Sequence, residues 1–244
     1  MVCSVFRFRR LAVASLIGLI VALPHGVRSQ PSPESDPHHH HQTHSQSSQS
    51  SQSSQSSPHG HSVGPAGSTY DLRWIDAMVQ HHTGALRMSE LVFDIGAPGV
   101  GALAKDIWRD QAQEIKAMGQ WRRAWYPDAP VFPVVLKAGG DPNAMAALSR
   151  MDPAQIAAMQ MRGTPPSRTG RVTWFLEGML QHHGAALLMA QDALKRSTNP
   201  TIRRLARNII VAQRKEIIQI RQMLQQGGLN RPEYYRYDAY FALN

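Results

Sequence analysis

Two histidine doublets lie in matching surroundings, and their neighbours are metal donors as well. Each of His81-His82 and His182-His183 has a methionine three residues before its first histidine and another seven residues after it. Imidazole nitrogen binds copper, zinc, nickel and iron, whereas thioether sulfur selects Cu(I). Because no cysteine and no cluster of carboxylates accompanies it, this donor set favours copper as Cu(I), Cu(II) or both. The candidate ligands are Met78, His81, His82, Met88, Met179, His182, His183 and Met189.

Helical spacing brings the donors around each doublet to one face. At about 100° per residue, the four candidate ligands of the first set fall within an arc of about 120°, with Ala85 among them. The second set repeats this arc around Ala186. Both alanines would let another helix approach closely. A stripe of histidine and methionine is most often ordinary core packing, but its recurrence in two matching copies favours a metal site.

Carboxylates and amides recur at matched positions after each doublet. Gln111 and Glu114 lie one helical turn apart, as do Gln213 and Glu216. A carboxylate that accepts the N–H of a ligating imidazole fixes its tautomer and orientation. We therefore expect these residues to lie next to the ligating imidazoles and orient them. The alternative is that each pair packs on the helix surface.

The doublets belong to an internal repeat that predicts the architecture. Residues 74–82 match 175–183 at an offset of 101, and 103–107 match 205–209 at an offset of 102. Apolar residues at three- and four-residue spacing predict four helices. One helical hairpin cannot cover its own apolar face, but two can. We expect an all-α four-helix bundle without competing strands, built from two αα-hairpins (70–126 and 171–226). The predicted helices are 71–95, 100–126, 171–197 and 200–226.

A long crossover joins the repeats, and an aromatic tail follows them. Residues 127–168 are rich in proline and glycine, and Asp141-Pro142 and Asp152-Pro153 each resemble a helix N-cap followed by proline. The aromatic tail 229–244 is expected to pack back across the bundle, with a partner-binding strap as the alternative. The crossover methionines are expected to fill apolar space rather than bind copper. They are Met145, Met151, Met159 and Met161.

Residues 1–29 have the order of a secretory signal peptide. A basic start precedes the apolar run 11–23, which is too short to span a bilayer comfortably, and small residues follow around Ser29. A retained membrane anchor is the alternative. Cleavage would remove Cys3 and four arginines, so that the formal charge falls from +9 to +5 and no stable membrane span remains. The mature chain would then have no disulfide, no thiolate site and no lipid-modified cysteine.

Residues 30–68 form a His/Ser/Gln-rich segment that is predicted to be disordered. It has almost no apolar side chains, so ordering it would bury too little surface. Its histidines indicate either a loose metal-collecting tail or a solvated tether. The candidate tail ligands are His38, His39, His40, His41, His44, His59 and His61.

The two repeats resemble domain-of-unknown-function family 305, which includes CopM-like exported copper-binding proteins. The resemblance lies in M-x-x-HH-x-x-A-x-x-M and LA-x-x-I-x-x-x-Q-x-x-EI, and both copies of each are present within 70–126 and 171–226. It implies a ferritin-like four-helix bundle and copper handling outside the cytoplasm. The family often has an aspartate near the start of each repeat. Asp71 matches it, whereas Val172 does not.

These features predict an exported metal-binding protein that sequesters or carries copper and is not an enzyme. Its partners would be the metal ion and another copper-handling protein, in the periplasm or outside the cell. The positive charge forms no compact basic stripe with aromatic residues, so nucleic-acid binding is not expected. One alternative is a ferritin-like carboxylate oxidase, although neither repeat contains Glu-x-x-His. Another is a non-covalent haem protein.

Overall fold

The computed structural model describes residues 61–243 of the chain. The predicted signal peptide and the tail up to residue 60 lie outside the described residues. So do six of the candidate tail ligands, namely His38, His39, His40, His41, His44 and His59.

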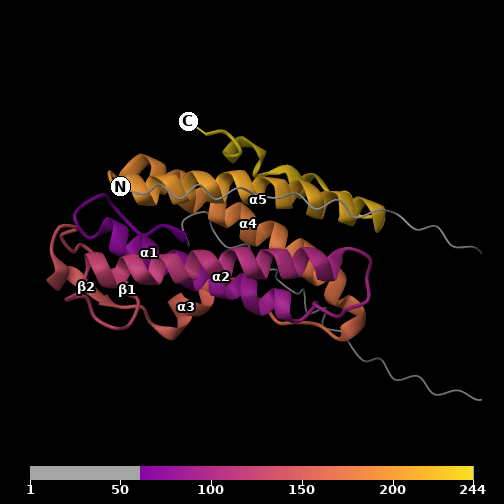
Figure 1. Cartoon of the computed structure of the whole chain (residues 1–244), viewed down its shortest axis with the longest axis horizontal. Helices are drawn as coiled ribbons and strands as arrows, with labels where there is room; N and C mark the ends of the chain where they lie inside the picture. The colour runs from indigo at the N-terminus through magenta and orange to yellow at the C-terminus, as the bar shows by residue number, and fades with distance from the viewer. Residues whose placement is uncertain (1–60, 244) are drawn as a thin grey trace, which may run out of the picture. The chain divides into compact units, whose positions relative to one another are not determined.

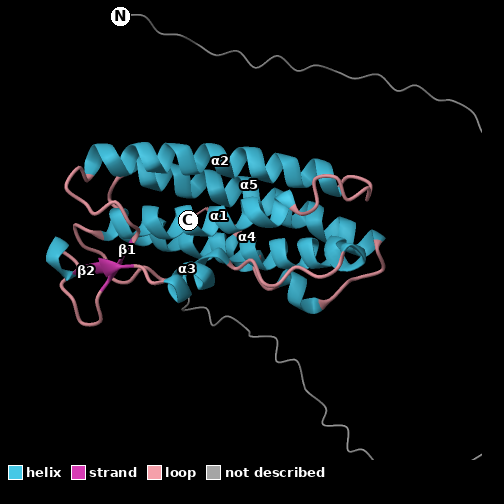
Figure 2. Ribbon diagram, turned by 90° about the horizontal axis from the view of Figure 1, so that it is seen from below, coloured by secondary structure: helices cyan, strands magenta, loops and turns pink. Residues whose placement is uncertain are grey.

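Four long helices form two αα-hairpins, as predicted from the repeat. Helix α1 (Tyr70–Glu90) packs on α2 (Val100–Trp125), and α4 (Arg171–Arg196) packs on α5 (Pro200–Gln226) (Figure 1). The hairpins meet through α1 and α4. Figure 2 shows α1 and α4 on one side of the bundle and α2 and α5 on the other. The helices that carry the histidine doublets are therefore neighbours.

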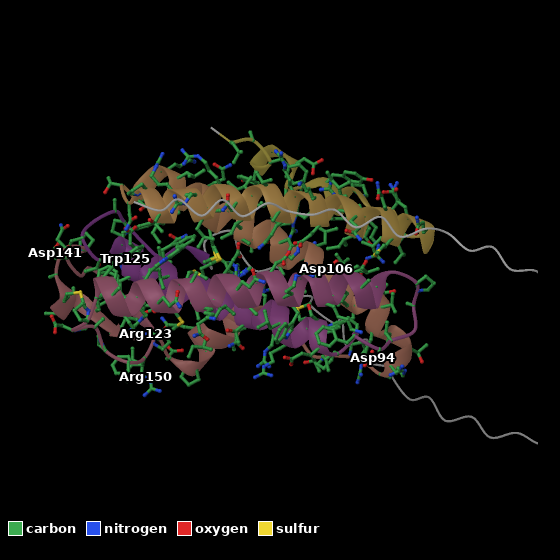
Figure 3. The ribbon with its side chains drawn as sticks, in the orientation of Figure 1. Asp94, Asp106, Arg123, Trp125, Asp141 and Arg150 are labelled. Atoms are coloured by element: carbon green, nitrogen blue, oxygen red, sulfur yellow. The ribbon has the colours of Figure 1, made fainter. Side chains whose placement is uncertain are left out.

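The core lies between these helices, and charged side chains lie outside it. Trp74 and Phe175, which occupy equivalent positions in the two repeats, are fully buried. By contrast, Asp94 and Asp106, both labelled in Figure 3, are exposed. No helix among residues 61–243 is both long enough and apolar enough to cross a membrane.

Helix α1 ends at Glu90, earlier than the predicted end near Ile95. The N–H groups of Leu91 and Val92 bond to carbonyls three residues back, so tight turns replace the α-helical pattern. The reason is the approach of α2, because a Cβ at Gly101 would overlap the carbonyl oxygen of Phe93. The chain must turn at this point to bring the second helix so close.

The crossover contains a strand pair that the sequence did not predict. Strands β1 (Val134–Leu136) and β2 (Leu148–Arg150) pair antiparallel, with Val135 opposite Ser149. Three residues hold too little alternation to produce a periodic signal. The strands and the following helix α3 (Pro153–Gln160) lie near α1.

One of the two predicted N-caps in the crossover is present. Asp152 and Gln155 form a capping box at the start of α3, with Pro153 at its first position. The N-cap predicted at Asp141 is wrong, because the short 3-10 helix that follows (Met145–Ala147) begins after Ala144. Instead, the Asp141 carboxylate accepts the backbone N–H of Asn143 at 2.9 Å, which closes a turn.

The last eight residues of the predicted tail, 61–68, lie within the described part of the chain. Residues 61–68 run along the bundle, because the buried Arg73 donates hydrogen bonds to the carbonyls of Val63 and Pro65. Ser68 also bonds to Asn143 in the crossover, at 3.0 Å. A buried guanidinium needs acceptors, and the backbone of this segment supplies them. Residues 61–68 thus bond to the bundle and to the crossover, although they fall within the segment that the sequence predicts to be disordered.

The aromatic C-terminal segment packs on the second hairpin. Tyr234 and Tyr237 are buried in the core, and the ring of Tyr237 lies directly on Gly184 of α4. The Arg221 side chain of α5 donates to the Tyr234 carbonyl at 2.7 Å. This segment covers α4 as the crossover covers α1.

Candidate metal centre

The first histidines of the two doublets meet across the α1–α4 interface. His81 and His182 are fully buried, and their ring centroids are 3.8 Å apart. The Nε2–H of His182 donates to the backbone carbonyl of His81 at 2.9 Å. This bond leaves Nδ1 of His182 as the nitrogen with the lone pair.

Several nitrogens at this contact have no hydrogen-bond partner among the described residues. They are both ring nitrogens of His81 and Nδ1 of His182. Leaving a buried polar atom unpaired costs about 1–3 kcal/mol, so native structures rarely do it without a reason. A bound metal ion would use lone pairs of this kind.

The second histidine of each doublet faces the other helix of its own hairpin. Nε2 of His82 lies 2.7 Å from Oε2 of Glu114, and Nε2 of His183 lies 2.8 Å from Oε2 of Glu216. Only the first contact has hydrogen-bond alignment. In both rings Nδ1 is buried and has no partner among the described residues. Each carboxylate is thus placed to orient an imidazole whose other nitrogen is available.

The predicted supporting amides do not reach the imidazoles. Gln111 and Gln213 are buried, yet neither amide bonds to a histidine in the described structure. Both amide atoms of Gln111 and the oxygen of Gln213 lack partners there. In the described residues the carboxylates of Glu114 and Glu216 contact the imidazoles and the glutamines do not, so a supporting role for Gln111 and Gln213 stays a prediction.

The four motif methionines are all buried in the same core as the histidines. Met88 of α1 reaches α4, since its Cε would lie 2.7 Å from a Cβ at Gly178. The carbonyl of Met189 on α4 accepts the indole N–H of Trp74 on α1 at 3.0 Å. The thioether end of Met88 therefore reaches the α1–α4 interface at Gly178, about one helical turn from His182. The buried set is Met78, Met88, Met179 and Met189.

Burial keeps the facing histidines uncharged. It lowers the pKa of His81 well below its usual 6.5, and the neighbouring His182 and His61 add to the effect. Burial likewise lowers the pKa of His182, with His183 and His82 contributing. A metal binds only the neutral imidazole, so the interface presents ligands that need not lose a proton first.

The crossover methionines are spread over different surroundings. Met151 and Met159 line a cavity of about 260 Å³ beside Ala77, whereas Met145 is 42% exposed. Met161 ends α3 with a φ of 48°. Met159 belongs to the same apolar core as the motif methionines.

Comparison with known proteins places the two repeats in a family. The family described as "Domain of unknown function (DUF305)" matches residues 71–224. The chain belongs to the DUF305 family. The match spans both hairpins and the crossover between them.

Similar solved structures include CopM in its Cu(I)-bound form, with 26% identity and a TM-score of 0.47, covering 64% of this chain and 96% of CopM. CopM is also known in Cu(II)-bound, silver-bound and apo forms. A DUF305 fragment from Deinococcus radiodurans has 23% identity and a TM-score of 0.47, covering 67% of this chain and 99% of the fragment. The uncharacterized protein L153 of Acanthamoeba polyphaga mimivirus is 35% identical over 55 residues, which is 22% of this chain and 36% of that protein.

Among residues 61–243, no three His, Cys, Asp or Glu side chains stand at the spacing of a metal site. The DUF305 histidines thus meet in pairs, His81 with His182 and each second histidine with a glutamate. An ion held at the first pair needs further donors. Thioether sulfur and imidazoles that turn toward the ion are the groups at hand.

One histidine near the DUF305 interface was expected elsewhere. His61 was predicted to lie in a disordered tail, but its side chain is 8% exposed and its ring centroid lies 5.5 Å from that of His81. It is the last histidine of the tract, and the Ser/Gln run gives way after it to a stretch containing Val63. That change of composition is the signal that could have separated it from the tail.

Proposed function

We propose that this DUF305 protein binds copper at the α1–α4 interface and sequesters or carries it outside the cytoplasm. The observation that carries the proposal is the contact between His81 and His182. Their rings lie 3.8 Å apart, fully buried, with three nitrogens that have no partner among the described residues. The four motif methionines are buried as well, and the thioether end of Met88 reaches the same pair of helices at Gly178.

Copper suits these donors better than the other divalent metals do. Zinc sites in proteins rely on cysteine, histidine and carboxylate, but residues 61–243 contain no cysteine, and Glu114 and Glu216 are engaged by histidines. Thioether sulfur favours Cu(I), and copper has the highest affinity in the divalent series. A site of imidazole and thioether could therefore hold copper in both oxidation states.

The proposed location of the protein rests on its N-terminal sequence rather than on the helical bundle. The predicted signal peptide at 1–29 supports export to the periplasm or the extracellular space. The donors at the interface serve binding, and the chain acts as a carrier or store rather than as an enzyme. A second copper-handling protein is the natural recipient or source of the ion.

The test is copper retention in a double variant, H81N/H182N. We expect the wild type to keep copper against a Cu(I) chelator such as bicinchoninate, and the variant to lose that tight binding. M159L is the control, because Met159 is a buried thioether that lies in the crossover cavity. Circular dichroism of the copper-free proteins checks that both variants fold. Equal retention by wild type and H81N/H182N would refute the proposal.

The two alternative functions have direct readouts on the same samples. Oxygen consumption after addition of Fe(II) would indicate a carboxylate oxidase. A Soret band in the purified protein would indicate haem. We expect neither signal, because α1 and α4 already meet closely at the histidine pair.

A further inference from the structure

His61 lies over His81 at the edge of the α1–α4 interface. It is buried, and its Nε2 has no hydrogen-bond partner among the described residues, as is also true of both nitrogens of His81. The segment before the bundle thus places an unpaired imidazole nitrogen next to others. Buried polar atoms without partners are rare, and three neighbouring rings with such atoms point to a missing common partner.

The spacing of the rings fits a shared ion on the His61 side of His81. A tetrahedral metal bound about 2 Å from each of two imidazole nitrogens keeps their ring centroids roughly 5 to 5.5 Å apart. The centroids of His61 and His81 are 5.5 Å apart, whereas those of His81 and His182 are 3.8 Å apart. The first pair is already at the distance that one ion requires, and the second pair must open to admit it.

A buried arginine holds the segment that carries His61. Arg73 lies about two helical turns before His81 on α1 and is 1% exposed. It donates to the carbonyls of Val63 and Pro65, the latter at 2.8 Å, and to the hydroxyl of Thr69 at 3.0 Å. These bonds fix the chain two residues after His61. The second hairpin has Trp174 at the position equivalent to Arg73, so this arrangement exists on one side only.

A cavity beside His61 provides space next to its imidazole ring. It measures about 190 Å³, and its lining includes His61, Leu188, Met189 and Gln191. Met189 is one of the motif methionines. The cavity therefore gives the imidazole of His61 room to turn, and Met189 borders the same space.

We propose that His61 is a third imidazole ligand of the copper site, supplied by the segment that precedes the DUF305 repeats. This inference rests on the proposed copper function and extends it. The ion is held by His61 and His81 with a thioether from α4, and His182 completes the set once its ring turns. One tight ion is then expected per chain, although the repeat has two copies.

The experiment compares H61N with H59N in the full mature chain. Each variant removes one histidine of the same tract, so binding by the remaining tail histidines is matched. We expect H61N to lower the affinity for Cu(I), measured by competition with bicinchoninate, by about 10- to 100-fold, a range seen even for residues behind the ligands. We expect H59N to stay within about twofold of wild type. The electron paramagnetic resonance spectrum of one equivalent of Cu(II) should show nitrogen coupling reduced in H61N alone.

The outcomes separate this inference from the proposed function. If H81N/H182N loses tight copper while H61N behaves as H59N, copper binds at the interface and His61 is not a ligand. If H81N/H182N retains tight copper, the proposed function itself is wrong. Thermal melting of copper-free H61N and H59N checks that both bundles are intact, so a drop in affinity confined to H61N can be assigned to the lost nitrogen.

Discussion

The two hairpins are alike at the interface between them. They differ on their outer faces, where the crossover packs on the first hairpin and the C-terminal segment packs on the second. Inside, each presents a buried histidine to the other hairpin and a second histidine to its own glutamate. Outside, α1 is covered at Gly84 by the end of α3, and α4 is covered at Gly184 by Tyr237. Gly84 and Gly184 are not equivalent positions of the repeat, so the two hairpins make room for their covering segments at different places.

Equivalent carboxylates anchor these different covers. Asp76 binds Arg122 at 2.6 Å and accepts the backbone N–H of Val134 at 2.9 Å, which holds the crossover. Glu177, at the matching position in the second repeat, binds Arg231 at 2.9 Å and accepts the hydroxyl of Tyr234, which holds the C-terminal segment. The repeat therefore preserves the anchoring role of the residue while the anchored segment differs.

The largest expected effect is the loss of the buried anchor. Replacing Asp76 by alanine leaves Arg122 without its carboxylate in a largely buried site, which costs about 3–5 kcal/mol in the free energy of unfolding. Glu177→Ala should cost about 1 kcal/mol or less, because both members of that pair are more exposed. Urea titration of the two variants measures the difference. Equal losses would show that burial does not distinguish the two anchors.

Acid should destabilise the copper-free bundle through its facing histidines. Burial lowers the pKa of His81 and His182 below 6.5 in the folded state, so below pH 6.5 the unfolded chain binds protons that the folded chain does not. Stability is then lost as the pH falls, with a slope of up to about 2.7 kcal/mol per pH unit for two protons. Melting curves from pH 8 to pH 5 test this.

The matched variants for the pH experiment are H81N and H182N. Each should remove part of the slope, and the two parts should be similar because the rings occupy equivalent positions. A slope that survives in H81N/H182N would assign the acid sensitivity to other groups.

The same glycine-to-alanine substitution should lower the free energy of unfolding by different amounts under the two covering segments. In Gly84→Ala the new methyl group overlaps the backbone carbonyl of Gln160, which cannot move without α3, and we expect a loss of about 1–3 kcal/mol. Gly184→Ala overlaps the ring of Tyr237, a side chain that can shift, so a smaller loss is expected. Gly119→Ala is the control. Its methyl would meet only Arg123 at 3.7 Å, and alanine favours the helix by up to about 1 kcal/mol.

The smallest expected effect concerns the two glutamates that contact the second histidine of each doublet. Glu114→Gln and Glu216→Gln should each lower copper affinity by less than about tenfold, because each carboxylate orients His82 or His183, the residue next to a ligand, rather than the ligand itself. The two changes should be equal if the interior is symmetric. Affinity falling only in Glu114→Gln would indicate that the hydrogen-bond alignment at His82, absent at His183, decides which hairpin supports the ion.

Much of the bundle could be predicted from periodicity and repetition. Long amphipathic helices have their own signal in the spacing of apolar residues, and α2, α4 and α5 begin and end within a residue or so of the predicted bounds. The end of α1 and the β1–β2 pair could not be predicted in this way. Both depend on contacts with segments distant in the chain, namely the start of α2 and the opposite strand.

The sequence by itself determined which donors are present, that they occur twice, and that each set lies on one helical face. Only the tertiary structure decided how they are used. Adjacent residues on a helix point about 100° apart, so the two histidines of a doublet face different neighbours. His81 and His182 therefore meet each other while His82 and His183 meet glutamates. The place of His61 depends on the acceptors that the buried Arg73 requires, and no local pattern reports such a contact.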